Sequence, residues 1–275
     1  MSATIGIQGF SIEDVIHEIE LNLWETWSNF GRGPGCTLHD ESDALWFETP
    51  IPVLPYNTVI KFQVERDVDS RIDYMINRYT ERNVPLLWIV HPSSLPHDLP
   101  ERLQQRGLQE IEIAPCMART LDELPEAPPL PAGVEIREAI EDNDLMELYG
   151  LAAWRWGVPE EFRPQLRKMI AKFEIGERTS KTRFWLAWKD GMPISKIGLY
   201  KGSGSAGIYG VATKPEARGL GIASLLMNVA MQAAKDMGYQ LAVLDSSPLA
   251  EKLYKRLGFV TVAPLRLYSP VAAYL

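Results

Sequence analysis

A glycine-rich turn between a strand and a helix constrains the fold more than any other stretch of the sequence. The segment VATKPEARGLGIASLL (211–226) runs from β-branched residues through Pro215 to Gly219 and Gly221, and then into helix-spaced apolar residues. Glycine is a poor helix former, so glycines at the first turn of a helix need another reason. The first amides of a helix lack internal partners and carry the positive end of its dipole. A turn without side chains, beside Arg218, therefore predicts a phosphate-binding site.

Two other interpretations of this turn remain open from the residues alone. The glycines can serve turn geometry only, because short glycine motifs recur by chance. Alternatively, residues 219–224 approximate GxGxxG, and Asp245 follows at roughly the ~20-residue distance typical of a dinucleotide site. The dinucleotide interpretation is weaker because Thr213 to Arg218, with a proline, separate the strand from the glycines, and because the preceding strands predict an antiparallel meander.

The residues around the turn predict a regular order of elements. After a strand at 134–139, apolar spacing predicts two helices, then three strands, a helix that ends at Gly238, a buried strand LAVL, a helix and closing strands. Asp190-Gly191 is a hairpin signal between the first two of the three strands. The helices are expected at 141–156, 159–176, 222–237 and 248–257, the last opened by Ser247-Pro248, and the strands at 183–188, 193–201, 206–213, 241–244, 259–262 and 266–270.

The N-terminal part of the chain resembles the C-terminal end. It predicts a helix at 11–30, strands at 44–50, 58–64 and 86–90, and a helix at 69–82. Residues 83–108 and 238–259 share a buried strand, a Ser/Pro helix start and a helix ended by glycine, which indicates a weak internal duplication. Aligned on Gly107 and Gly258, Leu103 falls opposite Tyr254. If the two halves of the chain are related, the N-terminal half has lost the residues that carry the chemistry.

A proline-rich connector predicts the domain boundary. The stretch LDELPEAPPLPAG (121–133) contains four prolines and no apolar periodicity. We therefore expect an N-terminal domain at 1–124, a linker at 125–133 and a C-terminal domain at 134–275.

Composition excludes several classes of function. The 275 residues carry a formal charge of −8 and no long Lys/Arg cluster, which argues against nucleic-acid binding. Cys36 and Cys116 form no CxxC pair, as expected in a reducing cytoplasm. No stretch approaches ~20 apolar residues and no leader opens the chain, so neither membrane insertion nor secretion is expected. No metal site is expected either, because the four histidines lack metal-ligand spacing: His17, His39, His91 and His97.

Two motifs together resemble one protein superfamily. The R-G-x-G-x-A core at 218–223 and LAEKLYKRLGF at 249–259 resemble the GNAT (GCN5-related N-acetyltransferase) superfamily. The resemblance implies an α+β fold with a mixed, mostly antiparallel central sheet flanked by helices, the acyl-CoA N-acyltransferase fold, in two tandem copies of which the N-terminal one is degenerate. It also implies acetyl-CoA, or another acyl-CoA, bound by Val211, Ala212, Thr213, Arg218, Gly219, Leu220, Gly221, Ile222, Ala223, Ser224 and Ser247. Family members often carry Asn where this chain has Ser247.

The resemblance assigns the catalytic roles. Tyr254 lies one residue off the apolar stripe of its helix, and a phenol of reference pKa near ~10 is a suitable proton donor to a thiolate. The resemblance gives this tyrosine that role; from its pattern alone it is a residue at the rim of the core. Asp245, at the end of the buried strand, is the candidate base. Family members also deprotonate the amine through ordered water, so the identity of the base stays open.

The helix-loop-helix around WRWGVPEE supplies candidates for the acceptor site. Aromatic rings and carboxylates suit an amine cation, although large aromatic residues more often belong to the core. The candidates in this segment are Trp154, Trp156, Glu160 and Glu161, and Tyr209 of the strand expected at 206–213 is a further substrate-binding candidate.

The sequence as a whole predicts a cytoplasmic acetyl-CoA-dependent N-acetyltransferase. We expect direct transfer to a primary amine of a small molecule or peptide through a ternary complex, by a monomer or homodimer. Two alternatives are an acyl-CoA-binding sensor or scaffold without turnover, and a dinucleotide-binding oxidoreductase. The acceptor and the acyl chain length stay open.

Overall fold

The elements of the computed structural model form two compact units, each assembled from separate parts of the chain. The structure describes residue 7, residues 9–176 and residues 180–270. Within these ranges, the first unit comprises the segment that ends at Leu23, Pro115–Arg155 and Phe173–Val262. The second unit comprises Trp24–Ala114, Trp156–Lys172 and the segment that starts at Ala263. Four elements contribute residues to both units: α1 (Ile12–Ser28), β5 (Gln109–Thr120), η3 (Ala171–Phe173) and β11 (Val260–Ser269).

The domain boundaries expected from the sequence remain a prediction. The connector residues 125–131 carry no helix or strand, as expected of an extended linker. Compact units follow contacts in space, whereas the predicted domains at 1–124 and 134–275 follow the order of the chain, so one division does not test the other.

The sheet of the first unit is mixed and mostly antiparallel, as predicted. An antiparallel series is formed by β6 (Val134–Glu138), β7 (Thr182–Lys189), β8 (Met192–Lys201) and β9 (Ala206–Thr213). Strand β10 (Leu241–Asp245) follows in the sheet, where it runs parallel to β9 and antiparallel to β5. The three-strand meander β7–β8–β9 is therefore confirmed.

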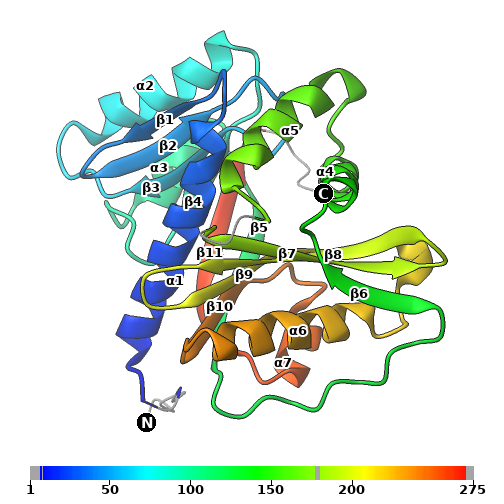
Figure 1. Ribbon diagram of the computed structural model, residues 1–275. Coiled ribbons are helices and arrows are strands. Elements are labelled where there is room, and N and C mark those ends of the chain that lie inside the picture. Colours follow the sequence, from blue (N-terminus) through cyan, green and yellow to red (C-terminus); the bar gives the residue numbers. More distant parts are fainter. Residues whose placement is uncertain (1–6, 8, 177–179, 271–275) are drawn as a thin grey trace. The chain divides into compact units, whose positions relative to one another are not determined.

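Helices cover both faces of this sheet (Figure 1). The apolar face of α6 (Ile222–Asp236) packs with Ile197 and Leu199 of β8 in one buried cluster, to which α7 (Glu251–Arg256) contributes Tyr254. Helix α4 (Asp142–Arg155) lies over the other face and contacts β8. Alternate residues of β8 consequently face α6 and α4.

The second unit has a smaller mixed sheet. An antiparallel series is formed by β1 (Thr37–Asp40), β2 (Ala44–Glu48) and β3 (Thr58–Phe62). Strand β3 runs parallel to β4 (Leu87–Val90), and β4 pairs antiparallel with β11. The other helices with residues in this unit are η1 (Asn29–Arg32), α2 (Val68–Glu81), α3 (Leu99–Gln105), η2 (Glu160–Phe162), α5 (Arg163–Ile170) and η3 (Ala171–Phe173). Trp46, Trp88 and Tyr79 fill its core.

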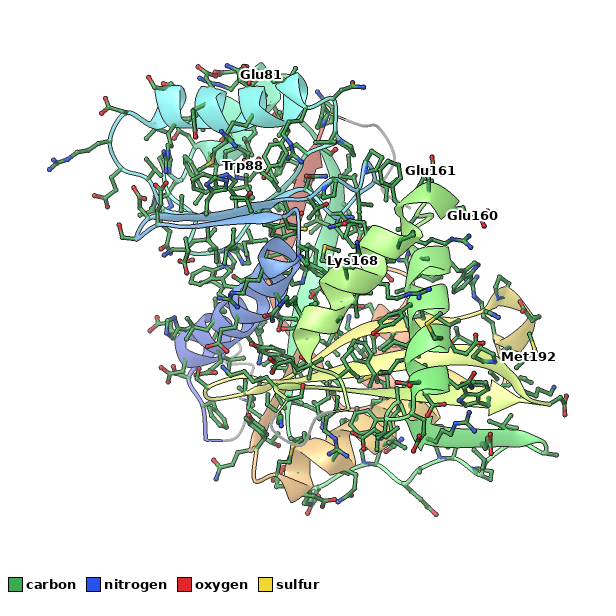
Figure 2. All side chains as sticks on the ribbon, turned by 45° about the horizontal axis from the view of Figure 1, so that its top comes forward. Glu81, Trp88, Glu160, Glu161, Lys168 and Met192 are labelled. Atoms are coloured by element: carbon green, nitrogen blue, oxygen red, sulfur yellow. The ribbon has the colours of Figure 1, made fainter. Side chains whose placement is uncertain are left out.

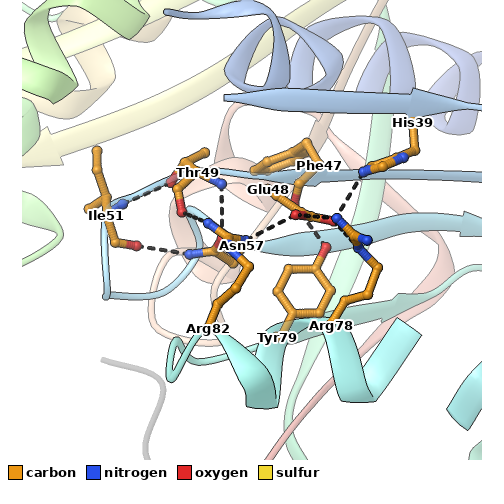
Figure 3. A network of polar contacts seen from close by, with 9 residues as sticks. All are labelled: His39, Phe47, Glu48, Thr49, Ile51, Asn57, Arg78, Tyr79 and Arg82. Carbon is orange, nitrogen blue, oxygen red and sulfur yellow. Dashed lines mark hydrogen bonds and ion pairs between the residues drawn. The ribbon is translucent and has the colours of Figure 1, made fainter. Parts of the chain in front are cut away.

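A buried carboxylate fastens α2 to the sheet of the second unit (Figure 3). Glu48 forms ion pairs with Arg78 at 2.5 Å and Arg82 at 3.3 Å, and its carboxylate forms a hydrogen-bond contact with His39 Nε2 at 3.0 Å. Burial alone would raise the pKa of the Glu48 carboxyl, but its hydrogen bond with Arg78 and the charges of Arg78 and Arg82 outweigh burial and lower the pKa. Tyr79 of the same helix donates a hydrogen bond to the carbonyl of Phe47 at 2.8 Å. We interpret this network as structural.

Several elements differ from the sequence prediction. The helix expected from Pro248 begins only at Glu251, because residues 248–250 form a turn. The helix expected over 159–176 is interrupted and consists of η2, α5 and η3. The two closing strands form the single strand β11, and strands β1 and β5 were not predicted.

Candidate active site

Strands β9 and β10 are paired over only a short distance. The parallel pairing joins Ala206 to Ala242 and Gly207 to Val243. Beyond these residues β9 continues along β8 as far as Thr213, whereas the next residue after β10, Ser246, donates its amide to the carbonyl of Pro115. Among the described residues, Ile208 to Thr213 have no pairing with β10. We call residues 208–213 the open β9 edge, and such an edge can accept an extended ligand chain through backbone hydrogen bonds.

A β-bulge interrupts the open β9 edge. Lys196 pairs with Ala212 and Gly198 with Tyr209, so that Gly210 and Val211 together lie opposite one residue of β8. Gly210 has a φ of +65°, which belongs to the left-handed region. Bulges free backbone groups from the ladder and are common beside active sites.

The glycine turn forms an exposed, uncovered start of α6. The short helix η4 (Pro215–Ala217) precedes it, and Gly219 and Gly221 have φ values of +78° and +77°. A Cβ at either glycine would meet nothing within 4 Å, so close packing does not explain these residues. Among the described residues, none of the amides from Gly219 to Ala223 has a backbone acceptor. The turn therefore offers several N–H donors to one anion.

Arg218 lies between this turn and the open β9 edge. It is exposed, and its Nε donates a hydrogen bond to the carbonyl of Thr213, the last residue of β9, at 3.3 Å. The guanidinium has further donors for phosphate oxygens. The open β9 edge, the positive charge of Arg218 and the amides of the glycine turn thus follow one another along the chain.

Tyr254 is a buried, neutral phenol. Its side chain is 6% exposed and its ring packs edge-on against Phe259. Burial, and then the charge of Asp245, raise the pKa of Tyr254 above its usual value. The hydroxyl consequently keeps its proton near neutral pH and can donate it, as the predicted acid role requires.

The charge of Asp245 acts both on Tyr254 and on a buried thiol. Asp245 ends β10 and pairs with Cys116 of β5. Burial, and then the charges of Asp245 and Glu20, raise the pKa of the Cys116 thiol. Because the thiolate is the nucleophilic form, Cys116 is poorly suited to attack a thioester.

The predicted acceptor residues fall into both units. In the first unit, Tyr209 donates its hydroxyl to Asn22 Oδ1 at 2.9 Å, and Trp154 is 41% exposed near the end of α4. Trp156 and Glu160 belong to the second unit, where Glu160 lies exposed on η2 beside Glu161 (Figure 2). The structure brings together the cofactor-loop residues and the Tyr254–Asp245 pair within the first unit.

Ser247 has a backbone role in the turn before α7. Its carbonyl accepts hydrogen bonds from the Ala250 amide at 3.0 Å and from Ser246 Oγ at 2.7 Å.

The sequence did not single out Lys196 or Asn22. The only available signal for Lys196 was a charged residue inside the otherwise uncharged strand segment PISKIGLY (193–200).

The corresponding strand edge of the second unit is occupied by the chain itself. Strands β3 and β4 are also paired in parallel over two residues each, Thr58 with Leu87 and Val59 with Trp88. Beyond this pairing, Leu95 donates its amide to the carbonyl of Phe62 at 3.0 Å, and Gln63 bridges to Leu95. The side chain of Gln63 also binds the carbonyl of Ser93. The edge that is open in the first unit is therefore closed in the second.

The comparison with protein families identifies the stretch that contains the open β9 edge. Residues 145–259 match the model of the Acetyltransferase (GNAT) family. This stretch is a GNAT acetyltransferase domain. It includes β7 to β10, the glycine turn and Tyr254. The chain is accordingly an acyltransferase, and the donors used by this family are acyl-CoA thioesters.

Solved structures extend the likeness beyond the GNAT domain. A GCN5-related N-acetyltransferase from Kribbella flavida matches 92% of this chain and 95% of its own, with a TM-score of 0.67 at 16% identity. A tandem GNAT protein from the clavulanic acid biosynthesis pathway matches 96% of this chain and 95% of its own, with a TM-score of 0.62 at 13% identity. A GCN5-related N-acetyltransferase from Sphaerobacter thermophilus matches 74% and 68%, with a TM-score of 0.57 at 20% identity. At these identities the likeness shows the fold, and the predicted fold class is confirmed.

No curated protein sequence matches the chain significantly. None of the helices within the described ranges is long and apolar enough to cross a membrane. In the same ranges, no group of three or more His, Cys, Asp or Glu side chains is placed to hold a metal ion.

Proposed function

We propose that this chain is an N-acetyltransferase that transfers an acetyl group from acetyl-CoA directly to a primary amine. One observation carries the proposal: the open β9 edge leads into an exposed glycine turn whose amides from Gly219 to Ala223 have no backbone acceptor within the part of the chain that the structure describes. An extended amide-containing arm suits the strand edge, and a diphosphate suits the turn.

The residues present fit acyl-CoA by shape as well as by charge. A side chain at Gly219 or Gly221 would point into open space, which is the space a diphosphate needs. Arg218 supplies a permanent positive charge next to it. We assign the residues from Val211 to Thr213 to the arm and Arg218 to Ser224 to the diphosphate.

The remaining side chains carry the proton transfers. Acetyl-CoA supplies an acyl carbon activated as a thioester. Transfer forms a bond from the amine nitrogen to that carbon and breaks the carbon–sulfur bond. The bound ammonium first loses one proton to Asp245, directly or through water, and the neutral amine then attacks. Its nitrogen loses a second proton to solvent as the amide forms, while Tyr254 gives its hydroxyl proton to the departing sulfur. Asp245 afterwards releases its proton to solvent. Solvent then returns a proton to the Tyr254 oxygen. The backbone N–H of Val211 in the bulge stabilises the charge that develops on the acyl oxygen.

The raised pKa of Cys116 supports direct transfer through a ternary complex. A covalent route needs a nucleophile beside the acyl group, and the thiol next to Asp245 is held protonated by burial and by two carboxylates. The amine itself is then the attacking group.

The acceptor candidates keep the roles expected from their chemistry. In the first unit, the exposed ring of Trp154 and the phenol of Tyr209 supply aromatic surface for the acceptor, whereas Trp156 and Glu160, in the second unit, keep this role as an expectation from the sequence. Aromatic faces and carboxylates bind an ammonium group before it loses its proton. These features support an amine of a small molecule or peptide as the acceptor class.

The closed edge of the second unit supports the interpretation of a degenerate N-terminal copy. Residues 93–95 occupy the edge of β3 that corresponds to the open β9 edge, and no glycine turn precedes α2. We propose one acyl-CoA site per chain, in a cytoplasmic protein that acts as a monomer or homodimer.

A thiol-release assay tests this function. Wild type and Gly221→Glu are incubated with acetyl-CoA and a panel of amino acids, polyamines, aminoglycosides and peptide N-termini. We expect free thiol from the wild type with at least one amine, and none from the variant. Binding of acetyl-CoA without thiol release from any amine would favour the sensor alternative, and thermal stabilisation by NAD but not by acetyl-CoA would favour the oxidoreductase.

A further inference from the structure

A buried lysine lies beside the bulge of the open β9 edge. Lys196 of β8 is 4% exposed, and its sheet neighbours Ile197 and Leu199 pack on the α6 side. Because side chains alternate along a strand, Lys196 projects from the face covered by α4 (Figure 1). A lysine in such a place needs a partner, because burial of an ammonium group without one is costly.

The partner of this lysine is the bulge itself. Lys196 Nζ donates a hydrogen bond to the carbonyl of Gly210 at 2.7 Å. The ring of Phe184 on β7 covers the ammonium group at 5.9 Å. A Cβ at Gly210 would lie 3.0 Å from Nζ, so glycine at this position gives the ammonium room to reach the carbonyl.

Planarity of the peptide bond connects this contact to the opposite side of β9. The carbonyl of Gly210 and the N–H of Val211 belong to one planar trans peptide and point in opposite directions. Lys196 approaches from β8, which lies on one side of β9, while the open edge lies on the other side. Fixing the carbonyl of Gly210 therefore directs the N–H of Val211 toward the open edge.

We propose that Lys196 is a positioning residue that holds the Gly210–Val211 peptide so that the Val211 N–H stabilises the acyl oxygen during transfer. This inference rests on the proposed function, because it assumes that the acyl group lies along the open β9 edge. The charge of the ammonium adds to the effect, since a charge-assisted bond to the carbonyl polarises the peptide and strengthens its N–H as a donor.

A structural role alone would have different consequences. A lysine that only fills space on the α4 face would affect folding stability but not the electronic state of a bound thioester. Polarisation of the acyl carbonyl is measurable without turnover, as a shift of its infrared stretching band to lower wavenumber. Acetyl-CoA labelled with ¹³C at the carbonyl makes that band identifiable.

The experiment compares wild type with Lys196→Met, which keeps the length of the side chain and removes the donor. Lys201→Met is the matched control, the same substitution on the same strand away from the bulge. For Lys196→Met we expect most of the band shift to be lost, kcat to fall by about 10-fold or more, and the Kd of coenzyme A to change by less than about 3-fold. Lys201→Met should behave as wild type in all three.

The outcomes separate this inference from the proposed function. A wild-type band position and kcat in a folded Lys196→Met would overturn the positioning role and leave the function standing. Failure of wild type to bind acetyl-CoA would overturn the function, and the positioning role with it. If Lys196→Met does not fold, Lys196→Gln retains a neutral donor and should show an intermediate band shift, whereas an unchanged shift would contradict the role of the charge.

Discussion

Individual side chains in the first unit obtain their properties from burial and from neighbouring charges. Tyr254 is held neutral because it is buried and because of the charge of Asp245, and Cys116 is held neutral by burial and by the charges of Asp245 and Glu20. The charge of Asp245 thus keeps Tyr254 protonated as a proton donor, and it also keeps the Cys116 thiol protonated and therefore weakly nucleophilic. The sequence predicted Tyr254 and Asp245 through the family resemblance, whereas the effect on Cys116 depends on the pairing of β5 with β10.

Removing the phenol hydroxyl tests the acid role. Tyr254→Phe keeps the ring that packs against Phe259, so the fold and the open β9 edge should be unaffected. We expect turnover to fall by ~10²-fold or more, with the Kd of acetyl-CoA nearly unchanged. Steady-state kinetics and calorimetric titration measure the two effects, and an unchanged kcat would remove Tyr254 from this role.

Ionisation of Lys196 should appear in the pH dependence of turnover. Burial, and then the charge of Arg155 on α4, lower the pKa of Lys196 to about 8, while its other close neighbours, Phe184 and Gly210, carry no charge. Loss of its proton weakens the bond to Gly210, so kcat should fall as the pH rises through about 8. Profiles of wild type and Lys196→Met with the same amine check this, since ionisation of the amine affects both proteins alike. Two superimposable profiles would contradict the prediction.

The same ionisation has the opposite effect on stability. The pKa of Lys196 lies below the ordinary lysine value of 10.5, so the unfolded chain binds more protons than the folded chain between about pH 8 and 10.5. The contribution of Lys196 to the free energy of unfolding therefore rises with pH across this window, while activity falls. No sequence pattern predicted this residue, because its partner lies 14 positions away on another strand.

Among the elements, those with strong local signals were predicted and those without were missed. The hairpin signal at Asp190-Gly191 and the apolar periodicity of 222–237 predicted β7, β8 and α6. Strand β5 was missed because Pro115 interrupts its pattern, and a proline argues against a central strand. In the folded chain the carbonyl of this proline accepts the amide of Ser246, which directs the chain after β10 away from β9.

The two ends of α6 offer a matched test of the glycine turn. Gly221 and Gly238 both have positive φ, and a Cβ at either would meet nothing within 4 Å. Glutamate at each position should cost a similar roughly 1–2 kcal/mol of stability. Only Gly221→Glu should abolish coenzyme A binding, because it places a negative charge and a side chain among the free amides of the turn. Thermal unfolding and calorimetric titration of both variants give the comparison, and retained binding in Gly221→Glu would mean that the phosphates lie elsewhere.

At the scale of the whole molecule, each unit contains one short parallel strand pairing, β9 with β10 in the first unit and β3 with β4 in the second. The two units differ in what the chain does after this pairing. In the first unit the chain after β10 pairs with β5 and leaves the β9 edge open, whereas in the second unit residues 93–95 close the edge of β3. The sequence indicates a weak internal duplication through a repeated strand and helix, and this stays a prediction. The closure was not visible in the sequence, because backbone hydrogen bonds of a loop leave no compositional signal.

This difference predicts a single cofactor site. Calorimetric titration of the wild type with acetyl-CoA should give one site per chain, and Gly221→Glu should bind none. A stoichiometry of two, or binding at half the wild-type stoichiometry in the variant, would show that the second unit also holds the cofactor.

A crystal structure of the chain in complex with coenzyme A tests the central claim most directly. We predict the diphosphate on the amides of Gly219 to Ala223, with Arg218 beside it, and the pantetheine arm hydrogen-bonded along residues 208–213 of β9. Coenzyme A bound at another place, with this turn and this strand edge empty, would contradict the account.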